Sequence, residues 1–172
     1  MKPRRYTGTA DGVAKGRRAG MTAFISEIEQ RSGGALWNNG DYVVRDIRGK
    51  AGQMSVHSTG RAVDLSYRFV QGTGKGAPSR GVREGGRQAA IQMCRLLIKN
   101  ADLLGLECIL DYFPEPYGRG WRCDRRDWIR YEVKTITGAP GGDWIHVEIS
   151  PDMADDAAKM RAAWTQIVPL DN

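Results

Sequence analysis

This sequence is poor in histidine and cysteine, and it has no long hydrophobic run. Its 172 residues include two histidines and three cysteines, and no two cysteines form a C-x-x-C pair. An odd, scattered set of cysteines argues against a disulfide framework and against a thiolate zinc site. No apolar run approaches the roughly 18–20 residues that cross a membrane. We therefore expect no transmembrane segment.

The N-terminus is basic, but no apolar stretch of the kind found in signal peptides follows it. Residues 1–18 are polar and rich in glycine, and we predict that they form a flexible basic tail. Residues 19–172 are predicted to form one domain, because the chain is of ordinary single-domain length and shows no internal repeat. We expect no secretion signal.

A net charge of +6 at pH 7 suits an anionic partner such as nucleic acid, an anionic membrane or an anionic cell wall. Charge alone does not choose among these partners. A nucleic-acid-binding protein is the hypothesis that the charge itself suggests. However, no helix-turn-helix, zinc-finger or RNA-recognition signature is present, so we expect no nucleic-acid partner.

Hydrophobic spacing predicts a small set of helices and strands, separated by glycine- and proline-rich loops of which residues 71–86 are the longest. Helices are predicted at 19–32, at 86–103 and from Pro151 onward, and strands at 42–47, 61–68, 106–112, 128–136 and 143–149. This order has no repeating βαβ rhythm. It predicts an α+β fold with a mainly antiparallel sheet flanked by helices.

Both histidines lie in dense polar clusters. His57 is followed by Gly60, which permits a turn, and then by Asp64 on a predicted strand whose other face is apolar. His146 lies on a second predicted strand. Catalytic zinc sites usually have three protein ligands and one open position, and these three side chains offer an N, O, N set. The sequence therefore predicts a Zn²⁺ site formed by His57, Asp64 and His146.

The combined pattern is S-x-H-x-x-G-x-A-x-D from Ser55 to Asp64, followed by D-x-x-H-x-E from Asp143 to Glu148. It resembles the zinc peptidases of the D-alanyl-D-alanine carboxypeptidase group. That group includes vancomycin-resistance D,D-dipeptidases and phage L-alanyl-D-glutamate endolysins, and it shares its fold with the hedgehog signalling domain. The resemblance implies a hedgehog/D,D-peptidase-like fold and zinc bound by the three residues named above.

The resemblance also implies that Asp143 is the catalytic base. Strand alternation alone would instead place Glu148 on the same face as His146. We prefer Asp143, because it lies at the entry of the strand, where alternation need not hold. Glu148 would then orient a ligand or the substrate.

Three further residues complete the predicted site. The resemblance implies an arginine upstream of the first histidine that stabilises the oxyanion, and Arg48 aligns with it better than Arg45. Ser55 would bind substrate or support the site. Trp144 would line a substrate cleft, or it would simply pack.

The residues themselves indicate metal-assisted amide hydrolysis, and the resemblance implies a zinc metallopeptidase that cuts peptide bonds in bacterial peptidoglycan. We expect an L-alanyl-D-glutamate endopeptidase rather than a D,D-carboxypeptidase, because the D-x-x-H motif is closer to the phage type. A bacteriolytic phage endolysin of this kind would be a monomer that is made in the host cytoplasm and degrades the cell wall after release. The alternative is a non-catalytic zinc domain that recognises a cell-wall or protein partner.

Overall fold

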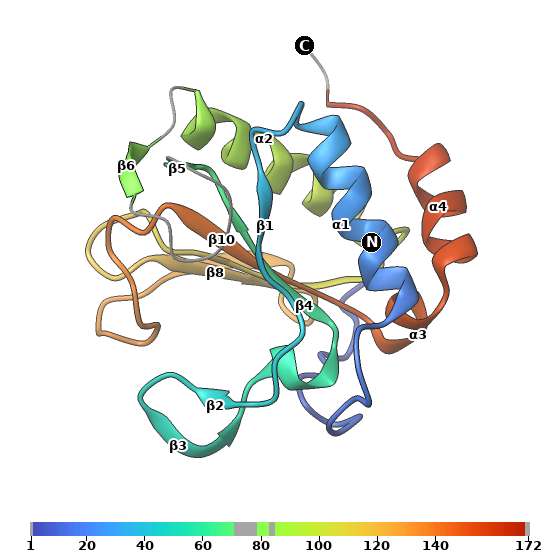
Figure 1. Cartoon of the computed structure of the whole chain (residues 1–172), viewed down its shortest axis with the longest axis horizontal. Helices are drawn as coiled ribbons and strands as arrows, with labels where there is room; N and C mark the ends of the chain where they lie inside the picture. Colours follow the sequence, from blue (N-terminus) through green and yellow to red (C-terminus); the bar gives the residue numbers. More distant parts are fainter. Residues whose placement is uncertain (1, 71–78, 83–84, 171–172) are drawn as a thin grey trace.

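A six-stranded antiparallel sheet forms the centre of the protein (Figure 1). The computed structural model describes residues 2–70, 79–82 and 85–170. Along the sheet the strands are β1 (Trp37–Gly40), β4 (Ala62–Ser66), β10 (Trp144–Ile149), β7 (Leu106–Asp111), β8 (Arg119–Arg122) and β9 (Asp127–Arg130). Every neighbouring pair in this sheet is antiparallel.

The helices pack on one face of this sheet. They are α1 (Ala19–Arg31), α2 (Gly86–Lys99), α3 (Pro151–Asp155) and α4 (Ala157–Thr165). The predicted α+β fold with a mainly antiparallel sheet flanked by helices is confirmed. Among the described residues, no helix is long and apolar enough to cross a bilayer.

Strand alternation decides which side chains enter the core. On β4, Val63 and Leu65 are fully buried against the helices, and on β10 Ile145 and Val147 are as well. The residues between them point to the opposite face of the sheet. Because β4 and β10 are neighbours, this alternation places polar side chains from both strands next to one another on the face without helices.

One glycine allows the helical layer to close. A Cβ atom on Gly20 would lie 1.9 Å from the carbonyl oxygen of Met153. Since no side chain fits in that space, only glycine lets the first turn of α1 approach α3 this closely. The final helical region, predicted as one helix, is divided at Asp156, whose side chain caps α4 by accepting a hydrogen bond from the amide of Lys159.

Two small hairpins accompany the main sheet. They consist of β2 (Asp46–Ile47) with β3 (Lys50–Met54), and of β5 (Arg68–Val70) with β6 (Ser79–Val82). The predicted long loop at 71–86 therefore contains a strand, while residues 71–78 and 83–84 lie outside the described part of the chain. A one-turn 3₁₀ helix, η1 (Val56–Thr59), joins β3 to β4.

The predicted strand at 42–47 is wrong over most of its length, since only Asp46 and Ile47 pair. Val43 and Val44 are both exposed. The carbonyl of Val43 accepts a hydrogen bond from the hydroxyl of Ser58 in η1 instead of one from a neighbouring strand. Similarly, the strand predicted at 128–136 ends at Arg130.

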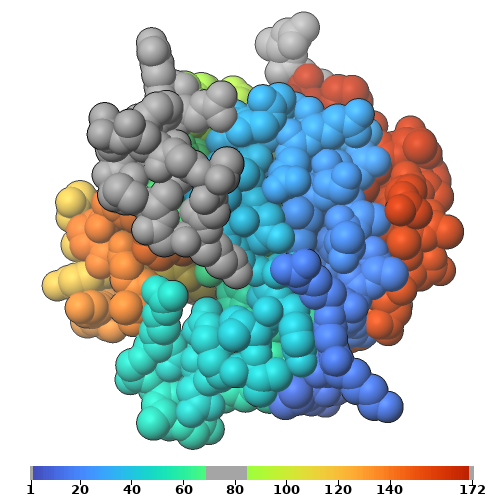
Figure 2. Space-filling view, in the orientation of Figure 1, coloured from blue at the N-terminus to red at the C-terminus, as the bar shows by residue number. Residues whose placement is uncertain are grey.

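The N-terminal segment, predicted as a flexible tail, contacts the rest of the domain over the described residues 2–18. The amide of Arg4 donates to the carbonyl of Cys123, and the amide of Ala14 donates to that of Ser58. Asp11 pairs with the buried Arg61 at 3.0 Å. The segment looked like a tail because it is polar, but its polar groups are used in contacts with the domain. It lies beside the β2–β3 hairpin along one edge of the molecule (Figure 2).

Candidate metal centre

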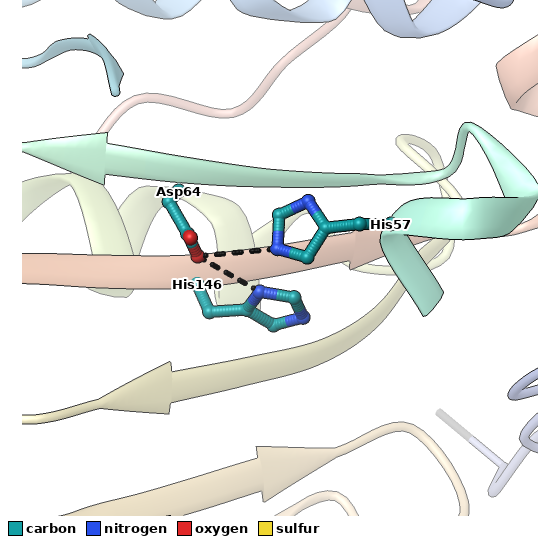
Figure 3. A group of neighbouring side chains, drawn as sticks. All are labelled: His57, Asp64 and His146. Atoms are coloured by element: carbon teal, nitrogen blue, oxygen red, sulfur yellow. Dashed lines mark hydrogen bonds and ion pairs between the residues drawn. The ribbon is translucent and has the colours of Figure 1, made fainter. Parts of the chain in front are cut away.

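Three side chains from separate elements meet on the face of the sheet without helices (Figure 3). His57 belongs to η1, Asp64 to β4 and His146 to β10. One potential ligand atom from each lies within 4.8 Å of the other two, so the cluster could hold a metal ion. Asp64 and His146 meet because they are direct partners in the register of the two strands.

A left-handed turn brings His57 to this pair. Gly60 ends η1 with a φ of 70°, a conformation that residues with a side chain rarely adopt. The chain can therefore reverse between His57 and β4, as the sequence analysis predicted. At the other end of η1 the side chain of Ser55 accepts a hydrogen bond from the amide of His57. Ser55 is buried, and its hydroxyl supports the histidine-bearing turn.

The main chain orients the ring of His57. Its Nδ1 atom lies 2.6 Å from the carbonyl oxygen of Asp41. A carbonyl can only accept a hydrogen bond, so Nδ1 donates to Asp41, and Nε2 is the ring nitrogen that faces the cluster. That Nε2 atom lies 3.4 Å from a carboxylate oxygen of Asp64.

Carboxylates orient the ring of His146. Its Nδ1 atom lies 3.0 Å from Asp64, and its Nε2 atom lies 3.0 Å from Oε1 of Glu148. The second oxygen of Glu148 accepts a hydrogen bond from the hydroxyl of Tyr6 at 2.7 Å. With Nε2–H donating to Glu148, Nδ1 is the atom available to a metal ion.

The charges in the metal-free cluster are strongly coupled. Burial opposes protonation of His146, but hydrogen bonds to Asp64 and Glu148 outweigh it and raise its pKa to about 9. Burial likewise opposes ionisation of Asp64, and hydrogen bonds from His146 and His57 lower its pKa below the usual range. In the metal-free cluster the two carboxylates therefore favour the protonated form of His146.

The three side chains differ in their exposure to solvent. The side chains of His57 and His146 are 3% and 8% exposed, whereas that of Asp64 is 21% exposed. Asp64 is therefore the most accessible of the three potential ligands. Two imidazole nitrogens and one carboxylate match the protein ligands of a catalytic zinc site.

Asp143, Arg48 and Trp144 are not members of this cluster. Asp143 is partly exposed and immediately precedes β10. Its carbonyl accepts hydrogen bonds from the amide of Tyr67 at 3.0 Å and from the hydroxyl of Ser66 at 3.1 Å, which anchors it beside the end of β4. Arg48 is exposed in the turn of the β2–β3 hairpin, where its carbonyl accepts a hydrogen bond from Thr137.

Trp144 packs against Tyr112, with 4.6 Å between ring centroids. This contact corresponds to the packing alternative for Trp144. Glu148 lies on the same face as His146, as strand alternation predicted.

Sequence reasoning missed Asp41 and Tyr6. Asp41 acts through its main-chain carbonyl, a group that every residue has and that no sequence pattern reveals. Tyr6 falls in the segment that was predicted to be a flexible tail. Its lone aromatic ring among polar residues was the available signal that this segment is anchored.

Comparison with models of protein families, with curated proteins and with solved structures found no match for this chain.

Proposed function

We propose that this protein is a zinc-dependent peptidase of bacterial peptidoglycan with a hedgehog/D,D-peptidase-like fold. The observation that carries the proposal is the cluster of His57, Asp64 and His146, which unites the two sequence motifs in space. In each histidine one ring nitrogen faces away from the cluster, Nδ1 in His57 and Nε2 in His146. This outer nitrogen already has a hydrogen-bond partner, whereas the inner nitrogen faces the cluster. The inner nitrogens and the carboxylate of Asp64 would hold Zn²⁺.

Each residue of the site has a role in this proposal. A bound zinc ion would polarise the scissile carbonyl and acidify a water molecule. Asp143 would take a proton from the attacking water as the water oxygen bonds to the carbonyl carbon, and would give that proton to the leaving amine as the C–N bond breaks. Arg48 stabilises the negative charge that develops on the carbonyl oxygen. Ser55 supports the turn that carries His57.

The contacts of Glu148 favour Asp143 as the base. Both carboxylate oxygens of Glu148 are occupied, one by the ring of His146 and the other by the hydroxyl of Tyr6. Glu148 is also only 4% exposed. A group with this burial and these partners is poorly suited to collect a proton from water. Asp143 is partly exposed at the entry of the strand and is better suited.

The substrate class rests on the motif resemblance and on the charge of the protein. A net charge of +6 suits binding to anionic cell-wall polymers. We propose cleavage of the L-alanyl-D-glutamate bond of the stem peptide, by a monomeric phage lysis enzyme that is made in the host cytoplasm and acts after release. Zinc binding without turnover would instead indicate a domain that recognises the cell wall or a protein partner.

The first experiment is mass spectrometry of purified peptidoglycan after incubation with the zinc-loaded protein. Wild type should create new peptide termini that identify the bond. Asp143→Ala should bind zinc stoichiometrically but lose turnover by about 10²–10⁴-fold, the usual contribution of a general base. Asp127→Ala, a change of another aspartate that is exposed on β9, is the matched control and should remain active.

Two results would change these assignments. An intact cell wall after incubation with zinc-loaded wild type would contradict the peptidase proposal. An active Asp143→Ala protein would contradict the assignment of the base and point to Glu148.

A further inference from the structure

The N-terminal segment, residues 2–18, contacts the two residues that hydrogen-bond the outer nitrogens of the histidines, Glu148 and Asp41. The hydroxyl of Tyr6 donates to Glu148, which in turn accepts from the ring of His146. The guanidinium of Arg17 pairs at 2.8 Å with the side chain of Asp41, the residue whose carbonyl holds His57. One continuous stretch of chain thus contacts both supports of the cluster.

Contacts on both sides of Tyr6 hold it in place. Before it, Arg4 pairs with Asp102 at 3.0 Å and donates to main-chain carbonyls. After it, the hydroxyl of Thr7 donates to the buried Glu107 at 2.6 Å. The guanidinium of Arg122 lies over the ring of Tyr6, 4.3 Å from its centre. The phenol is therefore a fixed donor rather than a group that meets Glu148 by chance.

The two contacts, Tyr6 with Glu148 and Arg17 with Asp41, differ in strength. Glu148 is buried, so its hydrogen bonds are formed away from competing water and determine the position of its carboxylate. Asp41 is buried but Arg17 is 65% exposed, so water competes for the guanidinium and weakens this ion pair. Tyr6 is consequently the main contact through which the segment acts on the cluster.

We propose that residues 2–18 are a working part of the metal centre, and that Tyr6 is a positioning residue that acts through Glu148 on the ring of His146. With one oxygen of Glu148 bound to Tyr6, the other faces Nε2 of His146 and keeps the proton on that nitrogen. Nδ1, which faces Asp64 at 3.0 Å, is then the nitrogen that would bind the metal in place of a proton. This inference rests on the zinc binding proposed above, but not on the substrate.

The test compares two variants that each remove one hydroxyl from the same segment. Tyr6→Phe removes the donor to Glu148, and Thr7→Val removes the donor to Glu107, which contacts neither histidine. Zn²⁺ affinity is measured by competition with a chelator, and the melting temperature of the metal-free protein is measured in parallel. We expect Tyr6→Phe to weaken zinc binding about 10-fold or more, as is typical for partners of metal ligands. Thr7→Val should stay within about 2-fold of wild type, while it lowers the melting temperature to a similar degree.

A double-mutant cycle shows whether Tyr6 acts through Glu148. In a Glu148→Gln background, Tyr6→Phe should cost much less affinity than in wild type, because the two changes interrupt the same chain of hydrogen bonds. Equal zinc affinity in Tyr6→Phe and wild type would overturn the inference. So would an equal loss in Thr7→Val, since it would reveal only general anchoring. Wild type that fails to bind zinc would overturn both proposals, whereas wild type that binds zinc but leaves peptidoglycan intact would contradict only the peptidase.

Discussion

His146 and His57 reach the same carboxylate from two different kinds of structure. His146 lies on β10, which has a paired strand on either side, and its outer nitrogen is held by the side chain of Glu148. His57 lies in a one-turn 3₁₀ helix between a hairpin and β4, and its outer nitrogen is held by the main-chain carbonyl of Asp41. The histidine on a strand is therefore held by a side chain, and the histidine on the short 3₁₀ helix is held by a main-chain carbonyl.

The two histidines are thus positioned and oriented in different ways. The position of His146 follows from strand register, and its electrostatics depend on a neighbouring carboxylate that one mutation can remove. The position of His57 depends on the path of two loops, and its partner remains whatever side chain occupies position 41. We therefore expect the two histidines to be equally necessary for zinc, but unequally sensitive to changes around them.

The largest effect should come from removing either ring. His57→Ala and His146→Ala should each weaken zinc binding by more than the roughly 10–100-fold that is lost when an outer partner is removed, and both should lose activity. They should differ in the metal-free protein. His146→Ala leaves Asp64 and Glu148 without the ring between them, so it should be the less stable variant by about 1–3 kcal/mol. Metal analysis after dialysis measures zinc binding, and denaturant titration measures the stability of the metal-free variants. Zinc retained at full stoichiometry by either variant would contradict the ligand assignment.

The next effect tests side-chain support against main-chain support. Glu148→Gln should weaken zinc binding by about 10–100-fold, because the amide is a poorer partner for the ring of His146 than the carboxylate. Asp41→Asn should change the affinity by less than about 3-fold, since the carbonyl that holds His57 is kept. Chelator competition measures both. A large loss in Asp41→Asn would show that the side chain of residue 41 also supports the site.

The smallest effect is a pH dependence of the metal-free protein. The pKa of His146 is raised from 6.5 to about 9, so folding favours its protonated form. Its contribution to stability is fully present below pH 6.5 and is lost as the pH rises through about 9. We expect the free energy of unfolding to fall by an amount on the order of 1–3 kcal/mol over this interval. Denaturant titrations from pH 6 to 10 measure this decrease. If the free energy of unfolding of His146→Ala depends on pH as strongly as that of wild type, the assignment to this ring is wrong.

The part of the site that could be predicted is the part encoded by local spacing. Alternation along residues 62–66 and 144–149 placed the apolar side chains in the core and the potential ligands on the other face. Gly60 marked the reversal that returns His57 to the strand. These features depend on neighbours in sequence, and periodicity reports such neighbours reliably.

Long-range partners were beyond the reach of the same reasoning. Polarity and glycine content suggested that residues 1–18 were detached, but polar groups of the described residues 2–18 bond with Arg61, Glu107 and Glu148, which lie far along the chain. The valines at 43 and 44 suggested a strand, but the turn that carries Ser58 uses their backbone instead. Composition describes what a segment contains and not which partners the rest of the fold brings to it.

The sequence by itself determined the α+β class, the apolar face of the central strands and the three residues that could hold a metal ion. Those properties follow from the two-residue period of a strand and from the few histidines available. Only the tertiary structure decided which nitrogen of each ring faces the cluster, and that the N-terminal segment supports it. Both depend on hydrogen bonds between groups far apart in the chain, such as Tyr6 with Glu148 and His57 with the carbonyl of Asp41, and these form only when the whole fold is assembled.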